Sequence, residues 1–241
     1  MTFHAHMDLR CYVVTGSGAV DDIVETAQRA AAGGAGVIQV RSKPIAAARL
    51  LELAEKVAVA VADVNPAAKT LIDDRVDIAA ILMRRGIPIH GVHVGQEDIP
   101  VTAVRELLGP DAIIGLTTGT AELIRSANAY ADIIDYVGAG PFRPTPTKDS
   151  GREPIGLDGY PHLVKLSHVP VVAIGDVQPA DVEDLAATGI AGVAMVRAFS
   201  EAYQASEELR SNGVTSLAQR VIKDFSAGQR AVSRNLVGEQ Q

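Results

Sequence analysis

Eight short apolar runs, each followed by a segment with apolar residues at helical spacing, constrain the fold of this chain more than any other feature. The runs are aliphatic and end in turn residues, which is typical of buried parallel strands. The predicted strands are 9–15, 36–41, 70–74, 91–94, 112–116, 133–137, 170–174 and 192–196. The predicted helices are 21–32, 44–64, 76–85, 101–108, 121–131, 157–166 and 179–187, with helical material from about 200 that includes 215–225.

Eight strand–helix units with no composition break between them predict an α/β fold, a single-domain (β/α)8 TIM barrel. We expect the barrel to span 9–226, between a flexible N-terminus at 1–8 and a polar C-terminal tail at 227–241. A doubly wound open sheet is the alternative fold. It lacks local support, because no Gly-x-Gly-x-x-Gly follows the first predicted strand.

Composition narrows the class of protein. The net charge of −7 argues against a nucleic-acid partner, which usually meets a basic stripe. No run of about 18 apolar residues occurs, so no membrane span is expected. The one cysteine, Cys11, excludes an intrachain disulfide framework and lies within a predicted strand, where packing is its expected role. We expect a cytoplasmic protein with small-molecule partners, and homo-oligomerisation stays open.

Charged and polar side chains collect where the predicted strands end, and in a barrel all these ends meet at one mouth. They include the cations Arg41, Lys43, Lys148 and Arg197 and the acids Asp74 and Asp98. An acidic protein that gathers cations at one rim is suited to bind a polyanion there. Mg²⁺ favours one or two carboxylates together with phosphate oxygens. The pattern therefore predicts a Mg²⁺–diphosphate site.

Several of these residues have simpler interpretations. Asp74 could cap the following helix and pair with Arg75. Asp98 could cap the next helix, where Pro100 suits the first turn. His93 lies between two valines, which is more typical of a hydrogen-bonded interior histidine than of a catalyst.

Four segments, 39–43, 73–79, 91–98 and 138–148, resemble the thiamine phosphate synthase family in order and spacing. The specific elements are Gly-Gln-Glu-Asp at 95–98 and Gly-Pro-x-x-Pro-Thr-x-Thr-Lys at 140–148, a rigid polar loop after a strand. The resemblance implies a Mg²⁺-dependent transferase of thiamine biosynthesis on a (β/α)8 barrel. Such enzymes join 4-amino-5-hydroxymethyl-2-methylpyrimidine diphosphate to 4-methyl-5-(2-hydroxyethyl)thiazole phosphate and release diphosphate.

The resemblance also implies residue roles. Asp74 and Asp98 would bind Mg²⁺, and Arg41, Lys43 and Lys148 would be catalytic at the diphosphate. Substrate-binding roles fall on Gln39, Arg41, Lys43, Asp73, Thr117, Thr145, Thr147, Lys148, Gly175, Val196 and Arg197. Of these, Gln39 and Thr117 match the pyrimidine diphosphate pocket. Thr145, Thr147, Gly175 and the backbone at Val196 match the thiazole phosphate contacts.

Four positions depart from the family pattern. Asp73 stands where asparagine is usual and could add a metal ligand or repel the diphosphate. Ser42 replaces a common glutamate. Asp176 replaces glycine at the phosphate cradle, and Arg197 replaces a small hydroxyl residue. We expect Arg197 either to pair with Asp176 or to supply charge to the phosphate directly.

Three other functions remain open. A thiazole tautomerase shares the barrel but needs a proton-transfer residue, typically a histidine after the fifth strand, where this chain has Thr117-Thr118-Gly119. The substitutions at 73, 176 and 197 would also suit a catalytically silent barrel that binds thiazole or pyrimidine phosphates. A phosphosugar isomerase or epimerase would need a general acid/base pair and no diphosphate clamp.

Overall fold

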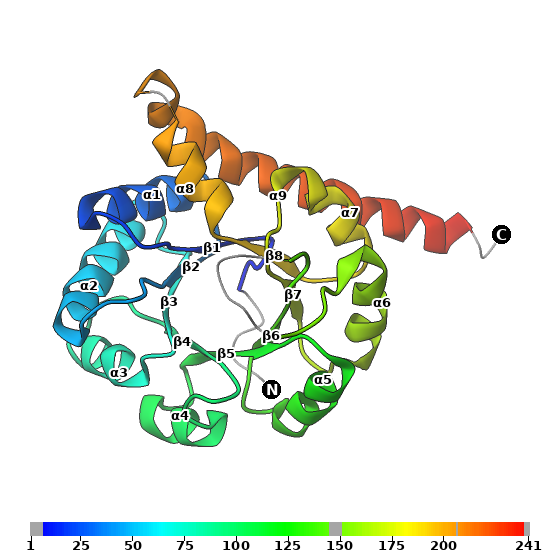
Figure 1. The fold of residues 1–241 in the computed structure, drawn as a ribbon, viewed down its shortest axis with the longest axis horizontal. Coiled ribbons are helices and arrows are strands. Elements are labelled where there is room, and N and C mark those ends of the chain that lie inside the picture. The colour runs from blue at the N-terminus through cyan, green and yellow to red at the C-terminus, as the bar shows by residue number, and fades with distance from the viewer. Residues whose placement is uncertain (1–6, 145–150, 206, 239–241) are drawn as a thin grey trace.

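The computed structural model is a closed ring of eight parallel strands surrounded by helices, and it describes residues 7–144, 151–205 and 207–238 (Figure 1). The strands are β1 (Cys11–Val14), β2 (Val37–Val40), β3 (Lys69–Asp73), β4 (Gly91–Val94), β5 (Ile113–Thr118), β6 (Tyr136–Ala139), β7 (Val171–Ala173) and β8 (Gly192–Met195). Each strand pairs with the next, and β8 closes the ring on β1, with Cys11 opposite Val193. The predicted (β/α)8 TIM barrel is confirmed.

Helices follow the strands and cover the outside of the ring (Figure 1). They are α1 (Val20–Ala32), α2 (Ala47–Val64), α3 (Val76–Arg84), α4 (Val101–Leu108), α5 (Ala121–Ala127), α6 (Gly156–Leu166), α7 (Val182–Ala187), α8 (Arg197–Gln204) and α9 (Glu207–Gly238), with 3₁₀ turns η1 (Asn128–Tyr130) and η2 (Pro179–Asp181). Among these helices none is long and apolar enough to cross a membrane.

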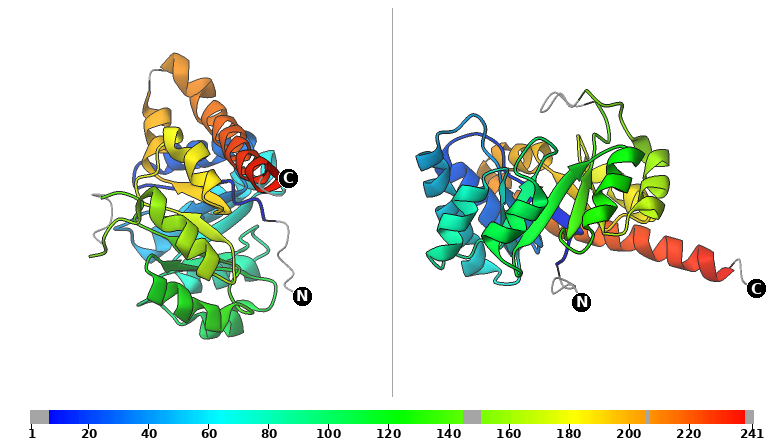
Figure 2. Two further views of the ribbon diagram at one scale, coloured as in Figure 1. Left: turned by 90° about the vertical axis from the view of Figure 1, so that its right-hand side faces the viewer. Right: turned by 90° about the horizontal axis from the view of Figure 1, so that it is seen from below.

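The last helix differs from expectation. α9 continues to Gly238, through residues that the sequence suggested would form a frayed tail. It packs against α1, α7 and α8, and its far end extends past the barrel (Figure 2). At Gly228 a Cβ atom would lie 2.1 Å from the carbonyl oxygen of Glu183. The missing side chain therefore lets α9 lie directly on α7.

Two other boundaries shift for local reasons. The sixth strand begins at Tyr136 rather than at residue 133, because the backbone N–H groups of Ile133 and Ile134 both donate to Tyr130 O and close a turn. The second helix begins at Ala47 rather than at Pro44, because the chain is still held to the loop after β1 by hydrogen bonds between Ser17 Oγ and the backbone of Lys43.

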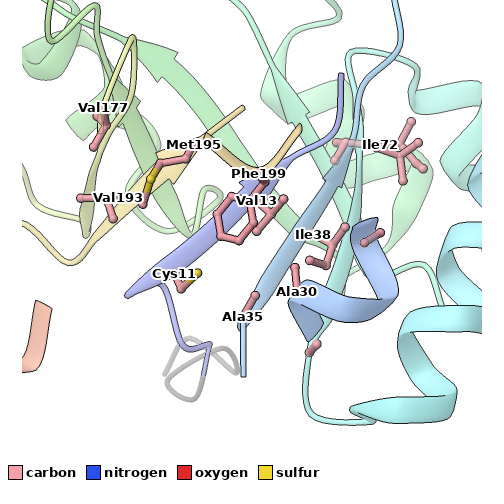
Figure 3. Packing of buried hydrophobic residues seen from close by; sticks show 14 of the residues in the cluster. Cys11, Val13, Ala30, Ala35, Ile38, Ile72, Val177, Val193, Met195 and Phe199 are labelled. Carbon is pink, nitrogen blue, oxygen red and sulfur yellow. The ribbon is translucent and has the colours of Figure 1, made fainter. Parts of the chain in front are cut away.

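Alternation along the strands produces two apolar layers. Outward residues such as Val13 and Ile38 pack with Ala30, Phe199 and the rest of the helices (Figure 3). Inward residues form a smaller cluster within the ring that consists of Leu9, Tyr12, Val14, Val37, Leu71, Ile113, Tyr136, Val172 and Ala194. Cys11 is a buried free thiol in the outer layer, where burial raises its pKa, so packing is its role as predicted.

Candidate active site

A cavity of about 580 Å³ opens at the carboxyl ends of the strands. The predicted site residues that line it are Gln39, Arg41, Lys43, Asp73, Asp74, Asp98, Thr117, Gly175, Val196 and Arg197. Thr145, Thr147 and Lys148 lie outside the described residues. One cavity thus collects side chains from strand ends that are far apart in sequence, as the barrel geometry predicts.

The β2 cations are held by hydroxyls that follow β1. Thr15 Oγ1 donates to Arg41 O at 2.8 Å and accepts from Arg41 N at 2.9 Å. Ser17 Oγ makes the same pair of contacts with Lys43 O and Lys43 N, at 2.9 and 3.2 Å. These bonds keep the segment after β2 extended, so Arg41 and Lys43 stay on the side that faces the cavity.

The end of β3 supplies two acids to these cations. Lys43 Nζ lies 2.9 Å and Arg41 Nε 3.4 Å from Asp73 Oδ2, and Lys43 also forms an ion pair with Asp74. Oδ2 of Asp73 is buried. Among the described residues it has these ion-pair contacts, but none of them has the geometry of a hydrogen bond. Burial and the adjacent Asp74 charge raise the pKa of Asp73 against the opposing effect of Lys43 and Arg41.

The end of β4 brings a third carboxylate. Asp98 Oδ2 accepts from Gly95 N at 2.6 Å, which fixes the loop after β4. Burial raises the pKa of Asp98, and the charge of Asp74 raises it further against the Gly95 hydrogen bond. The negative charge of Asp74 therefore disfavours the ionised form of Asp98, an effect that a bound cation would offset.

The simpler interpretations of these acids are wrong. Arg75, not Asp74, occupies the N-cap position of α3 and has no side-chain cap, and Arg75 pairs with Asp77. Pro100 occupies the N-cap position of α4, also without a side-chain cap. Asp74 instead turns toward Lys43, with its backbone at a φ of 57°.

The opposite wall is built from β6, β7 and β8. Arg197, at the start of α8, forms an ion pair with Asp176, whose Oδ1 also accepts from Gln178 Nε2 at 2.9 Å. Arg143 forms an ion pair with Asp181 and donates to Asp176 O at 3.1 Å. The structure therefore contains the Arg197–Asp176 pair that the sequence offered as one of two possibilities.

Glycine is required at the cradle position after β7. Gly175 has a φ of 101°, and a Cβ atom there would lie 2.6 Å from Pro141 Cα. Arg143 N donates to Gly175 O at 3.1 Å, which links this loop to the loop after β6. Gly175 and Arg197 both line the cavity on this wall.

Sequence reasoning missed two cavity residues and undervalued a third. Arg152 lines the cavity and donates to Thr118 O at 2.9 Å, and Gln178 lines it beside Asp176. Neither belongs to a strand end or to a recognisable motif. His93 also reaches the cavity, where Nε2 lies 2.9 Å from Thr117 Oγ1. Its alternation with Val92 and Val94 on β4 was the signal that it points inward.

The cavity has cations on two opposite walls, and paired carboxylates lie beside one of these groups. This arrangement suits ligands that place a phosphate group at each wall. The molecule is thus a (β/α)8 barrel whose strand-end cavity suits phosphorylated ligands. A family model described as thiamine monophosphate synthase matches residues 11–199, and the chain belongs to that family.

The sequences of curated relatives match this chain along nearly its whole length. A thiamine-phosphate synthase of Corynebacterium jeikeium (strain K411) is 63% identical over 222 residues, which are 92% of this chain and 97% of the relative. That of Corynebacterium efficiens (strain DSM 44549) is 56% identical over the same shares. Among solved structures, a thiamine phosphate pyrophosphorylase from Pyrococcus furiosus has a TM-score of 0.74 at 27% identity, covering 93% of this chain and 98% of that one. The family resemblance inferred from the motifs is confirmed.

Proposed function

We propose that this chain joins the pyrimidine diphosphate to the thiazole phosphate, giving thiamine phosphate and diphosphate. The observation that carries the proposal is the placement of two cationic subsites in one cavity. Arg41 and Lys43 lie beside the carboxylates of β3, and Arg197 lies beside Gly175 on the opposite wall. A single phosphorylated ligand needs one such subsite, whereas a coupling reaction needs both.

Magnesium belongs to the same proposal. In the described part of the chain no three His, Cys, Asp or Glu side chains group to hold a metal by themselves. Mg²⁺ does not need such a cage, because it commonly takes one or two carboxylates and completes its shell with phosphate oxygens and water. Asp98, whose pKa the charge of Asp74 raises, would hold it together with Asp74. When bound, the ion would neutralise charge on the diphosphate.

In the reaction, the carbon–oxygen bond between the pyrimidine methylene and the diphosphate breaks, and its electron pair leaves with the diphosphate. The thiazole nitrogen then forms the new carbon–nitrogen bond. Arg41 and Lys43 are placed to stabilise the charge that develops on the departing oxygen. Arg197 and the backbone at Gly175 would hold the second substrate, so that binding supplies the alignment. No side-chain nucleophile is required.

Lys43 pairs with Asp73 and Asp74, and Arg41 pairs with Asp73, so an incoming diphosphate would exchange places with these carboxylates. Asp74, no longer paired with Lys43, would then be one of the carboxylates that hold Mg²⁺. Ligand and metal binding are thereby coupled through the same lysine. A cytoplasmic location and homo-oligomerisation remain predictions from the sequence.

The experiment is a coupling assay. The protein is mixed with pyrimidine diphosphate, thiazole phosphate and Mg²⁺, and thiamine phosphate is quantified by chromatography. We expect product that disappears with EDTA and in Asp74→Ala, while the exposed-site variant His162→Gln keeps full activity. Thiazole phosphate binding without product formation would favour the tautomerase or the silent barrel instead.

A further inference from the structure

A row of hydrogen bonds runs through the inside of the barrel from β1 to the cavity. Tyr12 OH lies 2.7 Å from Tyr136 OH, which lies 2.9 Å from His93 Nδ1. His93 Nε2 lies 2.9 Å from Thr117 Oγ1. Both tyrosines are buried in the inner apolar cluster, whereas His93 and Thr117 line the cavity. One end of the row is therefore in an apolar interior and the other faces the ligand.

Two glycines make room for this row. At Gly115 on β5, a Cβ atom would lie 2.3 Å from Tyr136 OH and 2.4 Å from His93 Nδ1. At Gly138 on β6, it would lie 3.0 Å from His93 Cε1. Neither glycine has a positive φ, so the backbone does not require glycine at either place. The space itself is what these positions provide, and it is filled by the imidazole and the Tyr136 hydroxyl.

The buried end fixes the direction in which every hydrogen points. Burial raises the pKa of Tyr12 and of Tyr136, so both hydroxyls keep their hydrogens. Among the described residues, Tyr136 OH is the hydrogen-bond partner of Tyr12 OH, and the nearby charge of Asp73 raises the pKa of Tyr12 without a hydrogen bond to it. Tyr12 therefore donates to Tyr136, and Tyr136 donates to His93 Nδ1. The reverse direction would leave the Tyr12 hydrogen unpaired in an apolar interior, which is costly.

The direction continues through the imidazole. With Nδ1 accepting, the ring hydrogen is on Nε2, and Nε2 donates to Thr117 Oγ1. The Thr117 oxygen is then already an acceptor from inside the barrel. Its own hydroxyl hydrogen is left to point into the cavity.

We propose that Tyr136 and His93 are positioning residues that fix the Thr117 hydroxyl as a hydrogen-bond donor to the ligand. Thr117 would accordingly favour an oxygen acceptor, such as a phosphate oxygen, over a donor group of the same size. The choice of pyrimidine diphosphate as the ligand rests on the proposed function. The direction of the row does not, because it follows from the ligand-free protein.

The direction is tested by ¹⁵N NMR of histidine-labelled protein without ligand. We expect His93 in the Nε2–H tautomer in the wild type. Tyr12→Phe leaves this tautomer in place, because Tyr136 retains the hydrogen that it donates. Tyr136→Phe also removes one oxygen from the row, but this oxygen carries the hydrogen donated to His93 Nδ1. The ring is then no longer held in the Nε2–H tautomer. An Nδ1–H ring in the wild type, or an equal change in both tyrosine variants, would overturn the proposal.

The consequence for the ligand is tested by titrating pyrimidine diphosphate with Mg²⁺ in the absence of thiazole phosphate. We expect Thr117→Val and Tyr136→Phe each to weaken binding about tenfold, the usual worth of a hydrogen bond to a charged group. The double variant Thr117→Val/Tyr136→Phe should bind pyrimidine diphosphate no more weakly than Thr117→Val alone. Thr117→Ser should bind as the wild type does. Tyr12→Phe should lose less affinity than Tyr136→Phe.

Additive losses, or equal affinity in all variants, would overturn the donor role, because residues that act through one another are not additive. If the wild type did not bind pyrimidine diphosphate, the proposed function would fail instead. The tautomer measurement would then still decide the direction of the row.

Discussion

Arg197 and Asp176 form an ion pair across the ends of β7 and β8, within the wall that we assign to the thiazole phosphate. Asp176 has a φ of 59°, a conformation that is costly for a residue with a side chain. Asp176 and Arg197, where the motif resemblance led us to expect glycine and a small hydroxyl residue, thus pair with each other. A ligand anion at Arg197 would have to displace this carboxylate.

Arg197→Ser should weaken thiazole phosphate binding more than Asp176→Gly does. The first variant removes a guanidinium worth about tenfold in affinity, whereas the second frees that guanidinium and relaxes the backbone. Isothermal titration calorimetry with thiazole phosphate measures both. The reverse order would show that Asp176, and not Arg197, organises the phosphate subsite.

Asp73→Asn should lower the KM for pyrimidine diphosphate severalfold. The neutral amide no longer competes for Lys43 and Arg41, which lie 2.9 and 3.4 Å from Asp73 Oδ2. Steady-state kinetics at several Mg²⁺ concentrations measure the effect, with Asp74→Asn as the matched variant that should raise the Mg²⁺ requirement. If Asp73→Asn raised that requirement as well, Asp73 would be a metal ligand.

His90 should make the protein less stable at acid pH. Burial, followed by the charge of Lys69, lowers its pKa to about 4, and Nδ1 accepts from Thr70 N at 3.1 Å. Because the folded-state pKa is below the unfolded value of about 6.5, the unfolded chain binds the proton first, so this contribution is present above about pH 6.5 and is lost toward pH 4.

Urea unfolding at pH 7 and pH 4.5 measures this contribution. In His90→Gln the drop in the free energy of unfolding between the two pH values should shrink by about 1–2 kcal/mol, a figure reduced from the full shift because the ring is not fully buried. The exposed His162→Gln is the control. An unchanged drop in His90→Gln would remove His90 as the cause.

Gly228→Ala should destabilise the protein by about 1–3 kcal/mol, although glycine to alanine within a helix ordinarily stabilises. The added Cβ would lie 2.1 Å from Glu183 O and would push α9 away from α7. The exposed Gln219→Ala in the same helix should change the free energy of unfolding by less than about 0.5 kcal/mol. A stabilised Gly228→Ala would mean that α9 is not in close contact with α7.

Most of the barrel could be predicted because its signal is local. Each strand is a short aliphatic run, and each helix has its own period, so the order β1 to β8 follows from the chain alone. One error arises at a local turn and another at a contact between elements distant in sequence. Ile133 belongs to a turn closed by Tyr130, and α9 continues because Gly228 matches the surface of α7.

The cavity shows the same division. Arg41, Lys43, Asp74 and Asp98 could be placed because they follow strands, and the barrel rule brings strand ends together. The ion pairs between them needed coordinates. So did the contact of His93 with Thr117, since it depends on the space above Gly115 and Gly138, which no spacing in the sequence records.

Because β1 pairs with β8, the first strand cannot complete its pairing until the last strand has been synthesised. Arg10, just before β1, donates to Ser226 Oγ of α9 at 3.0 Å, so the two ends of the fold are joined outside the ring as well. On the ribosome, β1 emerges long before β8 and Ser226 have been synthesised. The barrel can therefore close only after β8 has been synthesised, and until then the nascent chain keeps both edges of its growing sheet unpaired.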